Sequence, residues 1–370
     1  MRIVITGATG NLGTALLRRL ATDAPNDTGF GGPHQIVGVA RRTPPDAPPY
    51  AGAAWHALDL GEPDARGQLL PLFAGADVVV HLAWLFQPSR DIDYLERVGV
   101  GGSRAVLEAA DAAGVPHLVH VSSVGAYAPA GFSDAGDKRR VDESWPTDGI
   151  DTLAYSKHKS AVERLLDAYE REHSDGGVRI ARMRPGFVLQ REAGSALLRY
   201  GLPGYVPAWV LRVVPVLPVD RRLLIPVVHT RDVADALVRA LHRRATGAFN
   251  LAGEPPVSRD DIAAALGARP IHVPAAALSA LLRATWRGHV QPLDPGWLDL
   301  GFAVPLMDTT RARTELGWTP TVDARDALRE AIEGMQDRAG TASPVLRPRS
   351  MLVQLKKMAS AGPIGRRRLP

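Results

Sequence analysis

Cysteine is absent from the 370-residue chain. Disulfide frameworks, thiolate zinc sites and cysteine nucleophiles are therefore excluded. Long apolar runs are also lacking, and none approaches the ~20 residues needed to cross a bilayer. The chain opens with MRIVITG and shows no long apolar segment of the secretory kind. These absences lead us to expect a cytoplasmic protein without stable membrane insertion.

A basic surface is lacking over most of the chain. The formal net charge is +5, but residues 336–370 alone hold eight basic side chains against one acid. The rest of the chain is therefore slightly acidic, and nucleic-acid binding is not expected. Because residues 336–370 are rich in Pro, Gly, Ser and Arg, we expect them to form a basic, disordered tail.

Short apolar runs alternate with helical patterns in the first half of the chain. Helices are expected at residues 11–20 and 155–172. The runs that predict buried strands are 2–6, 35–40, 77–83, 117–123 and 179–184. This alternation predicts an α/β fold with a doubly wound parallel sheet between layers of helices.

A glycine-rich turn, TGATGNLG at residues 6–13, follows the first predicted strand and begins a helix. Gly7, Gly10 and Gly13 would allow a tight turn and a close approach of the backbone to a pyrophosphate. The helix N-terminus would offer free N–H groups to the phosphates. A plain strand-to-helix turn is the alternative, but the position within a βαβ unit favours a dinucleotide site.

The end of the second predicted strand bears on the choice of cofactor. An acid there would bind the ribose hydroxyls of NAD, whereas this chain has Arg41 and Arg42. A guanidinium group can bind the 2′-phosphate of NADP through paired hydrogen bonds. We therefore expect NADP, with NAD as the alternative. Asp59, in ALDL at residues 57–60, is expected to accept a hydrogen bond from the adenine amino group.

Together these segments resemble the extended short-chain dehydrogenase/reductase family, also called the NAD-dependent epimerase/dehydratase family. The resemblance covers about residues 1–335. Its motifs are TGATGNLG, DL at 59–60, HLAW at 81–84, SSVGAY at 122–127, YSKHK at 155–159, RPGFV at 184–188, HTRDVADA at 229–236 and ELGWTP at 315–320. The cofactor contacts expected are Gly7, Thr9, Gly10, Asn11, Leu12, Gly13, Arg41, Arg42, Asp59, Leu60, Leu82, Ala83, Tyr155, Lys159 and Pro185.

Tyr155 and Lys159 are four residues apart and share one face of a predicted helix. A free tyrosine, with a pKa of about 10, is a poor base at neutral pH. A nearby ammonium group favours the phenolate and lowers that pKa. By the family pattern Ser123 is the catalytic serine, so the resemblance implies Ser123, Tyr155 and Lys159 as catalytic residues. A solvated surface pair of tyrosine and lysine is the alternative.

For several other polar residues we predict structural or solvent-exposed positions rather than catalytic roles. His117 and His120 are three apart on a strand and should face opposite sides, so no metal site is expected. We expect His158 to be solvated. Asp232, in HTRDVADA, is expected to cap a helix.

The resemblance also predicts the domain organisation. We assign residues 1–186 and 229–251 to an NAD(P)-binding Rossmann domain, and residues 187–228 and 252–335 to a smaller C-terminal substrate-binding region. An apolar stretch at 209–219 fits either a hydrophobic substrate pocket or part of the core. Family members are often dimers, so a homodimer is an expectation by analogy.

Three functions stay open at this point. The first is net hydride transfer between NAD(P) and a secondary alcohol or carbonyl of a small-molecule substrate, with Tyr155 as acid and base. The second is epimerisation or dehydration of a nucleotide sugar with a tightly held cofactor. Gly186 and Gly99 count against it, because those enzymes often have asparagine at both positions. The third is a cofactor-binding regulator without turnover, which typically lacks the tyrosine or lysine.

Overall fold

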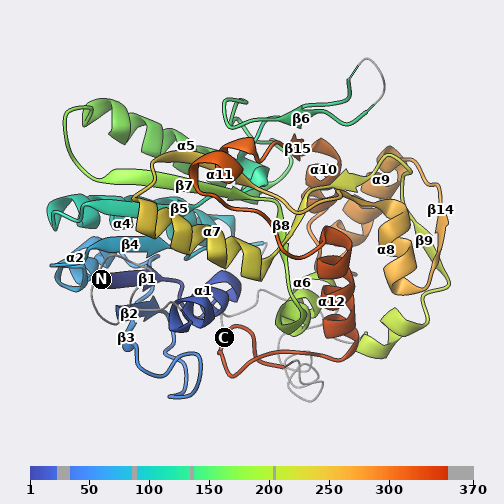
Figure 1. Ribbon diagram of the computed structural model, residues 1–370. Coiled ribbons are helices and arrows are strands. Elements are labelled where there is room, and N and C mark those ends of the chain that lie inside the picture. The colour runs from blue at the N-terminus through green and yellow to red at the C-terminus, as the bar shows by residue number, and fades with distance from the viewer. Residues whose placement is uncertain (23–33, 86–89, 134–136, 203–205, 349–370) are drawn as a thin grey trace.

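The computed structural model describes residues 1–22, 34–85, 90–133, 137–202 and 206–348. Its centre is a parallel sheet of seven strands in the order β12-β7-β5-β4-β1-β2-β3 (Figure 1). The strands are β1 (Arg2–Thr6), β2 (Gln35–Ala40), β3 (Ala54–Ala57), β4 (Val78–His81), β5 (His117–Val121), β7 (Arg179–Pro185) and β12 (Gly247–Leu251). This doubly wound, Rossmann-like arrangement matches the predicted fold class. Strand order reverses beside β1, between β1 and β4, where such sheets bind ligands.

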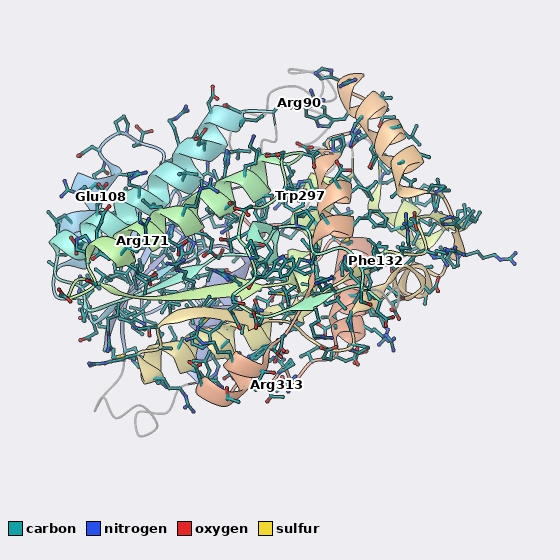
Figure 2. The ribbon with its side chains drawn as sticks, turned by 90° about the horizontal axis from the view of Figure 1, so that it is seen from above. Arg90, Glu108, Phe132, Arg171, Trp297 and Arg313 are labelled. Atoms are coloured by element: carbon teal, nitrogen blue, oxygen red, sulfur yellow. The ribbon has the colours of Figure 1, made fainter. Side chains whose placement is uncertain are left out.

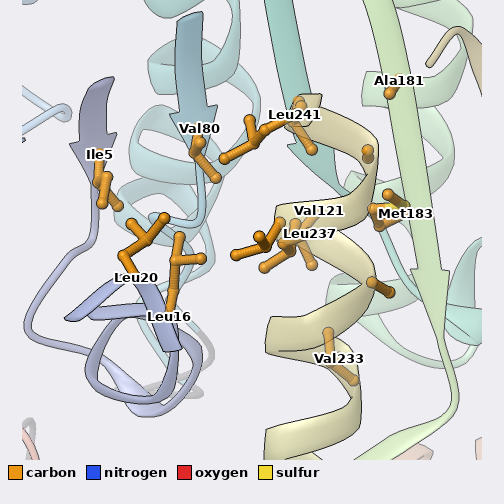
Figure 3. Packing of buried hydrophobic residues seen from close by; sticks show 14 of the residues in the cluster. Ile5, Leu16, Leu20, Val80, Val121, Ala181, Met183, Val233, Leu237 and Leu241 are labelled. Carbon is orange, nitrogen blue, oxygen red and sulfur yellow. The ribbon is translucent and has the colours of Figure 1, made fainter. Parts of the chain in front are cut away.

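Helices cover both faces of the sheet. One face is covered by α1 (Asn11–Ala21) and α7 (Thr230–Arg243), which pack on each other and on the strands through the cluster in Figure 3. The other face is covered by α2 (Ala65–Phe73), α4 (Gly102–Ala112) and α5 (Ala154–Glu172). Because both faces are covered, the inner strands are apolar throughout rather than alternating. Val78, Val79 and Val80 of β4, for example, are almost completely buried.

Short elements lie between the sheet and its helices. Helix α3 (Ile92–Glu96) continues as a π-helical turn at Arg97–Gly101 into α4. Single 3₁₀ turns lie at Val124–Ala126, Arg191–Ala193 and Ala208–Arg212. Helix α11 (Thr310–Glu315) packs beside the edge strand β12.

A second region gathers beyond the carboxyl ends of the strands, on the right of Figure 1. Its helices are α6 (Gly194–Gly201), α8 (Arg259–Leu266), α9 (Ala275–Arg287), α10 (Gly296–Ala303) and α12 (Ala324–Gln336). Its strands form two-stranded pairs: β8 (Phe187–Leu189) with β11 (Val227–His229), β10 (Leu224–Ile225) with β13 (Val257–Ser258), β9 (Val216–Pro218) with β14 (Arg269–Ile271), and β6 (Arg140–Val141) with β15 (Leu306–Met307). This region therefore lies on the side of the sheet where the connections after β1 and β4 leave toward opposite faces.

Some sequence expectations differ from the structure. The fourth expected strand ends at Val121 rather than at residue 123, because Ser123 caps the 3₁₀ turn through a bond from the Gly125 N–H to its Oγ. The apolar stretch at 209–219 does not form core, since Trp209 and Val213 are 59% and 60% exposed. Among the described residues, no helix is long and apolar enough to cross a membrane.

The chain after α12 also differs from expectation. Residues 337–348, predicted as the start of a disordered tail, fold back along α6 toward α1. Leu346 is 1% exposed and Ser343 is completely buried. Composition could not predict that the segment is ordered, because it is fixed by hydrogen bonds to backbone carbonyls and by one buried apolar side chain, Leu346. Residues 349–370 lie outside the described residues.

Candidate active site

The glycine turn joins β1 to α1 in a conformation that only glycines permit. Gly7 has φ +73°, and a Cβ atom there would lie 2.6 Å from the backbone nitrogen of Ala83. A Cβ atom on Gly13 would lie 2.5 Å from the backbone of Ala8. Gly10 precedes α1 without any side-chain cap, so the first N–H groups of the helix face the turn. The turn therefore fits a dinucleotide pyrophosphate, through close backbone approach and free N–H donors.

The residues beside the glycine turn belong to the neighbouring strand ends. The Leu82 N–H donates to the Thr6 carbonyl at 3.0 Å, so Leu82 and Ala83 lie directly beside the turn. The Asn11 side chain faces the second region, where it accepts a bond from Gln190 Nε2 at 2.6 Å. Leu12 is partly buried against the core below α1. Leu82 and Ala83 therefore adjoin the glycine turn, whereas Asn11 faces the second region and Leu12 packs against the core.

Arg41 and Asp59, expected at the adenosine end, are linked through a residue that the sequence reading missed. Tyr94 Oη donates to Asp59 Oδ2 at 2.8 Å and accepts from Arg41 Nη1 at 3.0 Å. Burial and the hydrogen bond to Asp59 raise the pKa of Tyr94 to about 12, so its phenol stays protonated and can serve as this donor. Leu60 is buried beneath α4 and supports this loop from below.

The three predicted catalytic residues meet where β5 ends and α5 begins. Ser123 and Tyr155 are hydrogen-bonded, and this bond favours the phenolate form of Tyr155. The Lys159 ammonium donates to the Val121 carbonyl at 2.9 Å and lies 3.5 Å from the centre of the Trp84 ring. Pro185, at the end of β7, is also buried near this edge of the sheet. Tyr155 and Lys159 do not form a solvated surface pair, because only 2% of Lys159 is exposed.

Burial dominates the acidity of both predicted catalytic groups. It raises the pKa of Tyr155 to about 12, against the opposing effect of the Ser123 hydrogen bond. It lowers the pKa of Lys159 to about 7, against the opposing effect of Glu163. The expected lowering of the Tyr155 pKa by Lys159 is therefore absent in this structure. The physical reason is that the ammonium faces Val121 and Trp84, while desolvation disfavours the phenolate.

Aromatic rings surround the Tyr155 phenol. The ring of Trp297, on α10, is centred 4.9 Å away, and that of Trp84 is centred 6.0 Å away, edge-on. Figure 2 shows Trp297 at the junction between α5 and the C-terminal helices. Leu300, also on α10, lies near Gly125 beside the Tyr155 ring. The surroundings of the candidate acid are thus predominantly apolar on the side of the second region.

A buried ion network supports helix α5 on the side of the sheet. Glu163, one turn after Lys159, is completely buried and accepts two bonds from Arg184, both at 2.9 Å. It also accepts from Arg182 at 3.1 Å and from Ser122 Oγ at 2.6 Å. These contacts join α5 to β7 and to the residue before Ser123. Sequence reasoning missed Glu163, although its place one turn beyond Lys159 on the same helix was a usable signal.

The predictions for His158 and Asp232 are wrong. His158 is buried, being only 9% exposed, and therefore is not solvated. Asp232 does not cap α7, whose N-cap is His229. Instead the Asp232 carboxylate accepts bonds from the backbone of Thr321 and Val322, so it anchors the loop that precedes α12.

The comparisons with known proteins agree with this geometry. The family described as "NAD dependent epimerase/dehydratase family" matches residues 3–252. The chain belongs to this family. That match spans the glycine turn, the Ser123–Tyr155–Lys159 group and all strands of the main sheet.

The relatives of the chain differ in length and in their names. An uncharacterized protein of Mycobacterium tuberculosis is 28% identical over 92% of this chain and 31% of its own length. The chain thus spans about a third of that relative. A dTDP-glucose 4,6-dehydratase of Streptomyces griseus is 27% identical over 89% of this chain and 92% of that protein.

Solved structures share the fold. A dTDP-glucose 4,6-dehydratase from Streptomyces venezuelae, with NAD bound, superposes with a TM-score of 0.66 at 18% identity. The match covers 91% of this chain and 97% of that one. At this identity the likeness concerns the Rossmann-like architecture of the family.

Proposed function

We propose that this member of the epimerase/dehydratase family is an NADP(H)-dependent oxidoreductase acting at a carbonyl or secondary alcohol of a hydrophobic small molecule. The observation that carries the proposal is the meeting of Ser123, Tyr155 and Lys159 beside the glycine turn. A dinucleotide bound at that turn would supply or accept a hydride. The chain's own residues would hold the substrate oxygen and move its proton.

The protonated form of Tyr155 suits carbonyl reduction, in which the phenol is the proton donor. With a pKa near 12 the phenol is protonated at neutral pH, and so it is ready to donate a proton to a carbonyl oxygen. The Ser123 hydroxyl, hydrogen-bonded to that phenol, would hold the same oxygen. The pKa of Lys159, lowered to about 7, allows this group either protonation state at neutral pH. Alcohol oxidation would first require the disfavoured phenolate.

The class of substrate is inferred from the walls of the site. Trp84, Trp297 and Leu300 surround the phenol with apolar surface. Recognition of a sugar diphosphate needs several placed polar groups, whereas apolar walls suit aryl or alkyl ketones. Gly186 supports this choice, because a Cβ atom there would lie 2.5 Å from the Pro226 carbonyl oxygen. An asparagine side chain, frequent at this position in sugar-nucleotide enzymes, would not fit without a backbone shift.

A nucleotide-sugar epimerase or dehydratase is the second candidate. The alignment with the Streptomyces griseus dehydratase over nearly the whole chain favours it. The two candidates differ in the fate of the cofactor. Internal hydride return leaves a tightly held dinucleotide unchanged, whereas a net reductase must exchange it.

The nicotinamide content of freshly purified protein, followed by exchange with added NADPH and NADH, separates these candidates. Exchangeable NADPH and its consumption with a panel of aryl and alkyl ketones would support the proposed reductase. A co-purified dinucleotide that does not exchange would favour the sugar-nucleotide candidate. Failure of either dinucleotide to bind would overturn both.

Tyr155→Phe tests the role of the phenol. Turnover should be lost while nucleotide affinity stays within about twofold, because only the proton donor is removed. Tyr169→Phe is the matched control, since Tyr169 lies on the same helix and bonds Asp111 away from the site. It should keep turnover. Undiminished activity in Tyr155→Phe would overturn the mechanism, and absence of any turnover in the wild type would favour a cofactor-binding regulator.

A further inference from the structure

The chain after α12 folds onto the glycine turn. We call residues 337–348 the C-terminal strap. Ser343 Oγ donates to the carbonyl oxygen of Thr9 at 2.5 Å, in a completely buried position. Thr9 is part of the turn expected to hold the dinucleotide. The strap therefore contacts the cofactor loop directly, although 334 residues separate the two partners in sequence.

Several contacts hold the strap in one path. Ser195 Oγ donates to the Arg338 carbonyl at 2.7 Å, and Arg199 Nη1 donates to the Arg347 carbonyl at 2.8 Å. A turn within the strap is closed by the Thr341 N–H, which donates to the Leu346 carbonyl at 3.0 Å. Leu346 is 1% exposed. The strap is thus anchored by hydrogen bonds along its length and by one buried apolar side chain.

The loop after β2 meets the strap through Tyr50. Tyr50 Oη is 3.0 Å from Thr14 Oγ1, on α1, and 3.3 Å from Thr341 Oγ1, on the strap. The Tyr50 side chain is almost completely buried. Strap, glycine turn and the loop that follows Arg41 and Arg42 therefore pack together as one border of the site.

Arginine side chains gather along this border. Burial lowers the pKa of Arg42, and the positive charges of Arg347 and Arg41 lower it further, so all three guanidinium groups lie within electrostatic reach. Among the residues that the structure describes, no ion pair joins Arg42 or Arg347 to a carboxylate. The Arg347 side chain is exposed. Like charges brought together without a counter-ion are costly unless an anion binds between them.

We propose that the strap completes the adenosine end of the cofactor site, with Arg347 and Arg42 together binding the 2′-phosphate of NADP(H). The proposal rests on the dinucleotide site of the proposed function. In Rossmann sheets the end of the second strand faces the 2′ position of the adenosine ribose, which is where Arg42 lies. Ser343 fixes the strap on the Thr9 carbonyl, and Arg347, four residues further along the strap, lies within electrostatic reach of Arg42. Specificity for NADP(H) is thus shared between residues at opposite ends of the chain.

The test is nucleotide affinity of the full chain, measured with NADPH, NADH, 2′,5′-ADP and 5′-AMP by calorimetry. Arg347→Ala should weaken NADPH and 2′,5′-ADP about tenfold, as expected for one charge-assisted phosphate contact. NADH and 5′-AMP should change less than about twofold. Arg329→Ala, which removes an exposed arginine from α12, is the matched control and should leave all four affinities unchanged.

A second variant tests the anchor rather than the charge. Ser343→Ala should weaken NADPH about threefold, because the strap loses its bond to Thr9. In the double variant Ser343→Ala/Arg347→Ala the loss should equal that of Arg347→Ala alone, since the anchor then has nothing to position.

The outcomes are distinguishable from those of the proposed function. Unchanged NADPH affinity in Arg347→Ala, or equal losses for NADPH and NADH, would overturn the strap proposal while leaving the dinucleotide site intact. Absence of binding of all four probes to the wild type would overturn the proposed function and the strap proposal together.

Discussion

The Nζ atom of Lys159 lies 3.5 Å from the centre of the Trp84 indole ring. Such a cation–π contact is worth about 0.5–2 kcal/mol. Trp84 can take this position because residue 99 has no side chain. A Cβ atom on Gly99 would lie 3.2 Å from the indole. Related enzymes often have asparagine at residue 99, whereas this chain has glycine there and the Trp84 indole packs against Lys159.

This contact predicts an optical titration of Lys159. Because the pKa of Lys159 is lowered to about 7, the charge beneath the indole should disappear as the pH rises through that value. Wild-type tryptophan emission should therefore show a step with a midpoint near pH 7. The step should be absent in both Trp84→Phe and Lys159→Met. An identical step in either variant would mean that the titrating group is elsewhere.

Glu163→Gln should lower the free energy of unfolding by about 3 kcal/mol at pH 7. The reason is that Arg182 and Arg184 would stay buried without their shared carboxylate. Urea denaturation followed by circular dichroism measures the change. Glu172→Gln, at the exposed end of the same helix, should cost little. A loss in Glu163→Gln no larger than in this control would contradict the structural role.

The same variant has a predicted pH dependence. The bonds from Arg184 and the charge of Arg182 hold the pKa of Glu163 below its ordinary 4.5, against the effect of burial. A lowered carboxyl pKa contributes stability that is present above pH 4.5 and is lost as the pH falls through the folded-state value. The stability difference between wild type and Glu163→Gln should therefore be constant from pH 5 to 7 and shrink below pH 4.5. A difference that grows on acidification would contradict the assignment.

Gly7 and Gly52 offer a matched comparison of strain and crowding. Both have positive φ, +73° and +86°, but nothing lies within 4 Å of a Cβ atom on Gly52. Gly52→Ala should cost only the conformational strain, about 1 kcal/mol. Gly7→Ala adds a clash with the Ala83 backbone and should cost about 3 kcal/mol or more, with loss of dinucleotide binding. Chemical denaturation and nucleotide titration of both variants check this, and equal costs would contradict it.

Arg41→Ala and Tyr94→Phe together test whether Arg41 contributes to the choice between NADPH and NADH. The substitution removes the hydroxyl that bonds both residues, so Arg41 becomes free to move. If Arg41 acts on the 2′-phosphate, Arg41→Ala should weaken NADPH far more than NADH. Tyr94→Phe should change the ratio of the two affinities by less than Arg41→Ala does. Equal weakening of both nucleotides by Arg41→Ala would remove it from the role.

Much of the fold could be predicted because the strands are buried on both faces. Continuous apolar runs such as RIVIT and QIVGVA have few other interpretations when helical patterns lie between them. The spacing of Tyr155 and Lys159 likewise indicated one helix face. Local pattern therefore sufficed wherever the contact partners lie within one element or the next.

The rest of the site could not be predicted because it depends on contacts between distant residues. Tyr94 and Asp59 are 35 residues apart, and no local pattern marks Tyr94 as the partner. The direction of the Tyr155 pKa shift could not be predicted from the sequence either. It depends on whether desolvation outweighs the nearby ammonium, and so on the path of the Lys159 side chain toward Val121.

The bond between Thr9 and Ser343 has a consequence for the living cell. During synthesis the glycine turn leaves the ribosome before the strap, which is made 334 residues later. At about 5–20 residues per second that delay is roughly 17–67 s. A nascent chain would thus carry a glycine turn bordered on one side only until the strap has been made. If the strap completes the cofactor site as proposed, cofactor capture would have to wait for the strap to be made.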